Sequence, residues 1–288
     1  MAPSRPSRDT ISMNLKLVRH LWGVDLNSGF APCLPRWRDV GYEAVEASLR
    51  FVPDRSAFLR FLKDSGWQWI AQVFSREFAP GGTVRDHLDS LRQQIDECLD
   101  AQPLFFNAHS GSDAWSAAEA EDFFGQVYDL EKKLGVPISH ETHRQRYFAT
   151  PWQTRHILQH FPHLRITSDF SHWVCVCERL LPDMGETIAI AARHCHHVHA
   201  RVGFAEGPQV PDPSAPEYAP QLAAHEAWWE QIWQSQKQRG FTRSTLTPEF
   251  GPPPYLHTLP YTNVPVADLP AVCDWMAKRQ RERFARLP

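Results

Sequence analysis

The chain alternates short apolar segments with amphipathic stretches of helical spacing, and this alternation repeats eight times. The expected strands cover residues 15–22, 42–48, 67–74, 103–109, 136–143, 164–172, 196–203 and 245–251. Strands that alternate with helices build parallel sheets through right-handed crossovers. Eight such units fit the ~250 residues of a closed β/α barrel. The 288-residue sequence therefore predicts an α/β fold, a single (β/α)8 TIM barrel.

Signals for helix boundaries lie between these segments. Asp54 is placed to cap a helix that ends at Gly66, and Ser116 with Glu119 forms a capping box for a helix that ends at Gly135. No internal repeat or linker divides the chain. We therefore expect residues 1–13 to form a flexible tail and residues 14–288 to form one barrel domain.

Two irregular segments are longer than a barrel needs for its connections. They cover residues 203–220 and 252–265 and are rich in proline. Loops of this length in a compact domain are usually lids or binding loops. We expect the first of them to be a lid or a binding loop.

Charge and cysteine content narrow the class of protein. The formal net charge is −3, which argues against nucleic acid as a partner, since binding to phosphate backbones needs a concentrated basic surface. The six cysteines show no disulfide framework, so we expect reduced thiols and a cytoplasmic protein. No apolar run reaches the ~20 residues that span a bilayer, so no membrane is expected as a partner.

Metal-ligand side chains occupy the carboxyl ends of four successive expected strands: Glu141, Asp169, His199 and Glu249. These strand ends meet at one rim of a barrel, where catalytic residues lie. A single acidic strand end more often caps a helix or pairs with a cation, but four in succession favour a shared ion. Three carboxylates and one imidazole suit a divalent metal ion, with Mn²⁺ as the first choice and Mg²⁺, Co²⁺ or Zn²⁺ as alternatives.

The seventh expected strand offers several candidates. Strand alternation places His197, His199 and Arg201 on one face, with His199 nearer the mouth than His197. We therefore choose His199 as the ligand, and His197 is either a second candidate or an interior histidine of a lower layer.

Four further side chains follow strands into the same mouth and are expected to contact substrate: His109, His143, His172 and Arg201. The alternative is that these groups are solvated, or that His109 or His172 binds a second metal. Six aromatic residues could stack on a substrate larger than a monosaccharide: Trp173, Trp228, Trp229, Trp233, Tyr255 and Tyr261. The helical spacing of Trp228, Trp229 and Trp233 favours a role in the core or an interface.

Taken together, the motifs HETH (140–143), DFSH (169–172), HVHAR (197–201) and TPEFG (247–251) resemble the xylose isomerase-like TIM-barrel superfamily. Its members include tagatose 3-epimerase-like enzymes, the sugar phosphate isomerase/epimerase group and, more distantly, endonuclease IV. The resemblance covers residues 15–283. It implies that Glu141, Asp169, His199 and Glu249 bind the metal, that Glu141 and Glu249 act as an acid/base pair, and that His172 touches substrate.

The expected function is a metal-dependent sugar isomerase or epimerase that abstracts a proton next to a carbonyl and passes through an enediolate. Its partner would be a small carbohydrate, and self-association is left open. A lyase acting on an oxidised sugar or glycoside is the first alternative. An endonuclease IV-like hydrolase is disfavoured because the third strand ends without a histidine and the net charge is negative. A non-catalytic carbohydrate-binding barrel is the third alternative.

Overall fold

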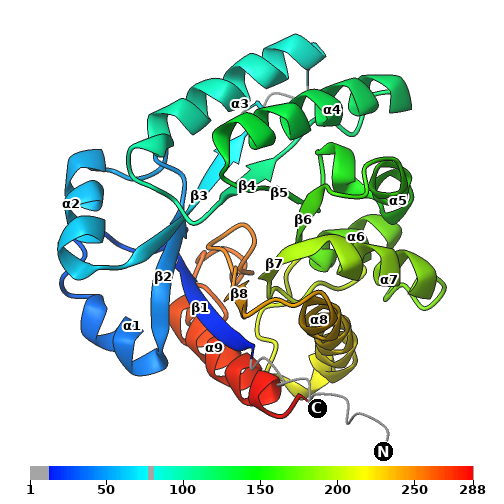
Figure 1. Ribbon diagram of the computed structural model, residues 1–288. Helices are drawn as coiled ribbons and strands as arrows, with labels where there is room; N and C mark the ends of the chain where they lie inside the picture. Colours follow the sequence, from blue (N-terminus) through cyan, green and yellow to red (C-terminus); the bar gives the residue numbers. More distant parts are fainter. Residues whose placement is uncertain (1–12, 77–80, 288) are drawn as a thin grey trace, which may run out of the picture.

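A computed structural model describes residues 13–76 and 81–287 of the chain. Eight parallel strands form a closed barrel in the order β1 to β8, and β8 pairs with β1 to complete it (Figure 1). The strands are Asn14–His20 (β1), Tyr42–Ala47 (β2), Gln68–Phe74 (β3), Phe106–His109 (β4), Ile138–Glu141 (β5), Arg165–Ser168 (β6), Cys195–His199 (β7) and Arg243–Thr247 (β8). The predicted fold class is confirmed.

Helices surround the strands as an outer ring (Figure 1). They are Leu34–Val40 (α1), Arg55–Ser65 (α2), Val84–Leu99 (α3), Ala117–Leu134 (α4), Pro151–His160 (α5), Phe170–Cys177 (α6), Gly185–His194 (α7), Ala219–Gln238 (α8) and Leu269–Ala285 (α9). Two short 3-10 helices cover Tyr147–Ala149 and Pro216–Tyr218.

The boundary signals act as the sequence predicts. Asp54 accepts a hydrogen bond from the backbone N–H of Ala57, and Ser116 and Glu119 form a reciprocal capping box. One helix was not predicted: α6 begins immediately after Asp169, whose carboxylate accepts from the backbone N–H of Ser171 at 3.2 Å. Its sequence, FSHWVCVC, is too short and too uniformly apolar to show a helical period.

The expected tail, except for Met13, lies outside the described residues. Within the described part of the chain, no helix combines the length and apolarity that a membrane span requires.

The barrel interior has an apolar layer below a polar one. Val18, Ala44, Ile70 and Phe105 form a separate buried cluster from the first three strands and the approach to β4. Two residues further along the same strands come His20, Glu46, Gln72 and Asn107, all buried. Successive side chains of a strand alternate between its faces, so this polar layer lies directly above the apolar one, toward the carboxyl rim.

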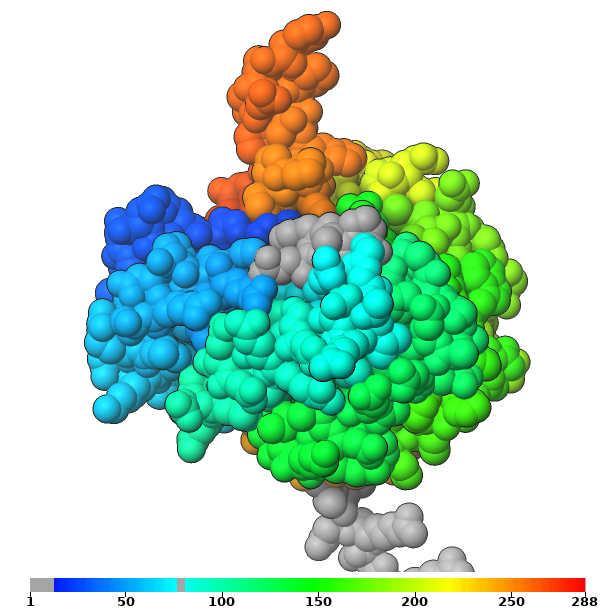
Figure 2. All heavy atoms as spheres, turned by 90° about the horizontal axis from the view of Figure 1, so that it is seen from above, coloured from blue at the N-terminus to red at the C-terminus, as the bar shows by residue number. Residues whose placement is uncertain are grey.

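The connection between β8 and α9 rises from the body of the molecule and is drawn in orange in Figure 2. Its two arms pair through a bridge between Thr258 and Pro265 and a hydrogen bond from the Leu259 N–H to the Val264 carbonyl at 2.8 Å. Leu259 and Tyr261, near its end, are exposed.

Candidate metal and substrate site

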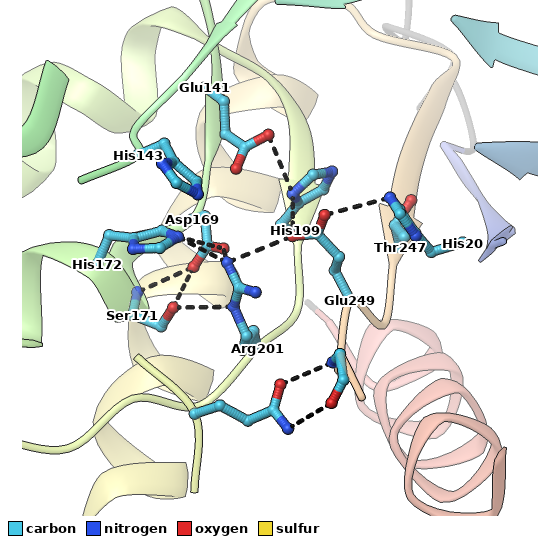
Figure 3. A network of polar contacts seen from close by, with 12 residues as sticks. His20, Glu141, His143, Asp169, Ser171, His172, His199, Arg201, Thr247 and Glu249 are labelled. Atoms are coloured by element: carbon cyan, nitrogen blue, oxygen red, sulfur yellow. Dashed lines mark hydrogen bonds and ion pairs between the residues drawn. The ribbon is translucent and has the colours of Figure 1, made fainter. Parts of the chain in front are cut away.

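The four side chains at the strand ends meet at the carboxyl rim. Glu141 ends β5, Asp169 follows β6, His199 ends β7 and Glu249 follows β8. Each offers a ligand atom that lies within 4.8 Å of the others, and all four residues are buried (Figure 3). The structure therefore brings together residues that lie more than a hundred positions apart in the sequence.

His199 is held from both sides. Its Nε2 lies 3.0 Å from Oε1 of Glu46, below it in the barrel, and its Nδ1 lies 2.9 Å from Oε2 of Glu249. Burial by itself lowers the pKa of His199, but the carboxylates of Glu249, Glu46 and Glu141 together raise it well above its usual value. With a proton on Nε2 directed at Glu46, the Nδ1 atom is left to face Glu141 and Glu249.

Several polar atoms of this cluster lack hydrogen bonds of acceptable geometry with the described residues. They are Glu141 Oε1, Glu249 Oε2 and His199 Nδ1, all three buried; the last two lie 2.9 Å apart as an ion pair without hydrogen-bond geometry. A buried polar atom without a hydrogen bond is costly, by ~1–3 kcal/mol or more for a charged group. Atoms of this type, directed at one point, are what a divalent cation binds.

The charges support the same conclusion. The carboxylates of Glu46, Glu141, Asp169 and Glu249 are buried together. Within the described residues, they contact Arg201 and the histidines around them rather than any lysine. Arg201 supplies one positive charge to four carboxylates, and a His199 that binds a metal through Nδ1 is neutral, so a divalent cation would offset most of the remaining negative charge. The residue set therefore fits one divalent metal ion.

Arg201 lies among the candidate ligands. Its guanidinium bonds to Oδ2 of Asp169 and lies 3.4 Å from Oε2 of Glu249 and 2.7 Å from Nε2 of His172. The other Asp169 oxygen accepts from the hydroxyl of Ser171. Burial raises the pKa of Asp169 to about 6 although Arg201 opposes this shift. Both Asp169 oxygens thus have protein partners, so an ion bound here would share Asp169 with Arg201.

Two of the three histidines predicted to contact substrate, His109 and His143, lie beside Glu141. His109 Nε2 is 3.0 Å from Glu141 Oε2, and the His143 ring centre is 4.7 Å from that of His109 and 3.9 Å from that of His172. His109 and His143 line the cavity above the cluster. His172 has no exposed surface and packs behind His143 and Arg201.

His197 lies in a lower layer than His199. Its Nδ1 is 2.7 Å from the hydroxyl of Thr245 and its Nε2 is 3.3 Å from Glu46 Oε2. This places it among interior polar groups, below the four-residue cluster.

Two important residues were not identified from the sequence. Glu46 on β2 accepts from Asn107 at 2.8 Å and from the hydroxyl of Thr247 at 2.6 Å, in addition to His199. His20, at the end of β1, lies 3.2 Å from Glu249 Oε1. A usable signal existed: Glu46 and His20 occupy inward positions of strands that a barrel buries on both faces, where a charged group needs a partner.

A cavity of about 570 Å³ lies above the cluster. Its polar lining includes His20, His109, Arg201 and Glu249. Of the six aromatic residues considered from the sequence, Tyr255 lines it, whereas Trp173, Trp229 and Trp233 are fully buried in the core. The other aromatic rings in the lining are Trp22, Phe51 and Phe74.

No family model matches the chain, and no curated protein matches it. Solved structures do share its architecture. A D-allulose 3-epimerase from Methylomonas sp. in complex with D-allulose aligns with a TM-score of 0.61 at 15% identity, over 96% of this chain and 100% of that one. A xylose isomerase-like TIM-barrel protein from Mycobacterium smegmatis in complex with magnesium aligns with a TM-score of 0.61 at 13% identity, over 94% and 96% of the two chains.

A probable 3-DHS dehydratase from Bacillus anthracis aligns with a TM-score of 0.58 at 14% identity, over 95% of this chain and 100% of that one. At these identities the likeness is one of fold, and it extends over nearly the full length of each protein. The chain therefore has the TIM-barrel fold that these structures share, including that of a xylose isomerase-like TIM-barrel protein.

Proposed function

We propose that the protein is a metal-dependent isomerase or epimerase of a sugar or sugar derivative. The observation that carries this proposal is the convergence of Glu141, Asp169, His199 and Glu249 within reach of one ion, with Glu249 lining a cavity. Sugar epimerases among the structures of the same fold support the reaction class. Mn²⁺ is the ion we favour.

When bound, a divalent ion at this site would polarise a carbonyl oxygen and stabilise negative charge that develops on it. Glu249 is suited to take the proton, because it lines the cavity and His199 and Arg201 keep the pKa of its carboxyl below the usual value although burial raises it. An ionised carboxylate at that position can act as the general base.

His20 lies beside Glu249. The backbone N–H of Trp22 donates to His20 Nδ1 at 2.8 Å, so the neutral imidazole carries its proton on Nε2. His20 Nε2 lies 3.2 Å from Glu249 Oε1, without hydrogen-bond geometry. The other carboxylate oxygen of Glu249, Oε2, lies 2.9 Å from His199 Nδ1, within the group of four candidate ligands. Glu141, whose Oε2 lies 3.0 Å from His109 and 2.9 Å from the Asn107 amide nitrogen, would be the second acid/base group.

Elimination is a second candidate, because the same proton abstraction begins it and a probable dehydratase shares the fold. The two reactions differ in their products: elimination releases water or an alcohol, whereas epimerisation keeps the mass of the substrate.

Exchange of substrate C–H for solvent deuterium tests the proposal. The protein, loaded with Mn²⁺, is screened against ketoses, aldoses and keto-glycosides, and metal content is measured on the purified chain. We expect stoichiometric divalent metal and deuterium incorporation next to a carbonyl. Glu249→Gln should lower the rate of deuterium exchange by ~10²–10⁴-fold and leave the far-UV circular dichroism spectrum unchanged. Glu217→Gln, on the exposed connection before α8, is the matched control. Full exchange in Glu249→Gln would remove this residue from the mechanism.

A further inference from the structure

The cavity above the cluster has two chemically different parts. Its polar part lies at Glu249, His20 and Arg201. The wall beyond it comes from the connections that follow β1 and β2 and is apolar: Leu21, Trp22, Val24, Leu26, Phe51 and Val52. A sugar hydroxyl placed against these side chains would lose its hydrogen bonds to water without replacement. The apolar wall therefore favours an apolar group of a ligand over its hydroxyl groups.

Aromatic rings line this wall in edge-to-face pairs. The rings of Trp22 and Tyr255 have centres 4.9 Å apart and planes at 80°, and those of Phe51 and Phe74 have centres 5.6 Å apart and planes at 75°. Phe51 keeps 53% of its surface exposed although it lines the cavity. An apolar group of a ligand placed in the cavity would contact these side chains.

The positions of two of these rings are fixed. The guanidinium carbons of Arg144 and Arg201 lie 5.0 Å and 5.1 Å from the centre of the Tyr255 ring, within the range of cation–π attraction. The Trp22 indole occupies the space above Gly251, where a Cβ atom would come within 2.2 Å of it. A preformed aromatic surface costs less to bind to than one that must be ordered.

We propose that the substrate is an aryl glycoside or a similar sugar derivative with an aromatic substituent. Its sugar ring would lie at Glu249, and its aromatic group would lie against Trp22, Phe51 and Tyr255. The volume of 570 Å³ falls in the range of sites that enclose ligands with several ring-sized parts. This inference rests on the proposed function, since it takes the sugar end of the cavity from it.

Binding of two glycosides that differ only in the substituent tests the inference. Affinities of phenyl and methyl β-D-glucopyranoside are measured by calorimetry on the metal-loaded protein. We expect the phenyl compound to bind about ten-fold more tightly or better, because it buries an additional apolar ring. Phe51→Ala and Trp22→Ala should each reduce the phenyl-to-methyl ratio to less than about three-fold.

Trp152→Ala is the matched control, because Trp152 on α5 is an aromatic side chain, 52% exposed, that does not line the cavity. It should keep the wild-type ratio, and thermal unfolding verifies that each variant is folded. Equal affinity for both glycosides, no measurable binding of the phenyl compound, or a ratio that both cavity variants leave unchanged would each overturn the inference.

The outcome is separable from that of the proposed function. Deuterium exchange with simple ketoses, without a preference for the phenyl glycoside, would retain the reaction and reject the aromatic subsite. A phenyl preference that depends on Phe51, in a protein without bound metal or exchange, would retain the subsite and reject the reaction.

Discussion

Glu46 lies across the barrel interior from His199 and contacts its Nε2 through both carboxylate oxygens, at 3.0 Å and 3.1 Å. The contact fixes which nitrogen of the imidazole faces the candidate metal site. A carboxylate that accepts from a ligating histidine also makes the ligand more basic. Although burial alone raises the pKa of Glu46, His199 and His197 hold it well below its usual value.

We expect Glu46→Gln to weaken metal binding by about 10–100-fold, the usual effect of removing such a partner. The measurement is a calorimetric titration of the metal-free protein with Mn²⁺. Glu43→Gln is the matched control, since Glu43 lies on the same strand and pairs with Lys16 on the exposed side. Equal affinities in the two variants would show that Glu46 does not act on the metal through His199.

Gly251→Ala should displace the Trp22 indole. An ideal Cβ at this position lies 2.2 Å from two atoms of the Trp22 ring. The backbone is held in place by the Gln209 side-chain amide, which accepts a hydrogen bond from the Gly251 N–H at 2.7 Å and donates one to the Gly251 carbonyl at 3.1 Å. We expect a loss of ~1–3 kcal/mol in the free energy of unfolding and a reduced phenyl-to-methyl preference. Gly185→Ala, which meets no atom within 4 Å, should be neutral or stabilising. A free energy of unfolding of Gly251→Ala equal to that of the wild type would show that the added Cβ does not clash with the Trp22 indole.

His225 should make the protein less stable as the pH falls. Burial lowers the pKa of His225 from 6.5 to about 4, while its Nε2 accepts from the Gly203 N–H at 3.2 Å and its Nδ1 donates to the Gln221 carbonyl at 2.8 Å. Between pH 6.5 and 4 the unfolded chain therefore binds a proton that the folded chain does not, so stability increases with pH over this window.

The contribution of His225, fully present above pH 6.5, should fall by about 3 kcal/mol as the pH decreases to 4. Urea unfolding at several pH values measures it, and His225→Gln should show a shallower loss than the wild type over the same window. If the free energy of unfolding changed with pH equally in the wild type and in His225→Gln, His225 would not be the source of this pH dependence.

Glu226 joins α8 to α9. Its carboxylate, 3% exposed, accepts from Arg279 at 2.6 Å and 3.0 Å and from the Gln280 amide at 2.8 Å. We expect Glu226→Ala to cost ~2–3 kcal/mol, because it removes charged hydrogen bonds and leaves Gln280 without this acceptor. Glu230→Ala, which removes a more exposed pair with Arg283, should cost at most ~1 kcal/mol. Similar losses of unfolding free energy in the two variants would show that the burial of Glu226 does not increase its contribution to stability.

Local sequence patterns were sufficient for the fold. Capping residues such as Asp54 and Ser116 and the period of the apolar residues set the elements, and eight alternations left a closed barrel as the simplest arrangement. The proximity of Glu141, Asp169, His199 and Glu249 followed from that topology, since parallel strands place their carboxyl ends at one rim.

Contacts across the barrel interior were not predictable in this way. Glu46 and Glu43 look alike in the sequence YEAVEAS, and only the inward face of β2 distinguishes the buried carboxylate from the exposed one. The bond between Arg201 and Asp169 and the aromatic wall of Trp22 and Phe51 depend on side-chain directions that no local pattern records.

Closure of the barrel through β1 and β8 also bears on how the chain folds during synthesis. Leu15 pairs with Ser244, so the first strand to leave the ribosome cannot complete its ladder until the last one has been made. Contacts this distant in sequence slow folding and leave a strand edge open to wrong partners meanwhile. We therefore expect refolding from denaturant to be slow and its yield to fall as protein concentration rises.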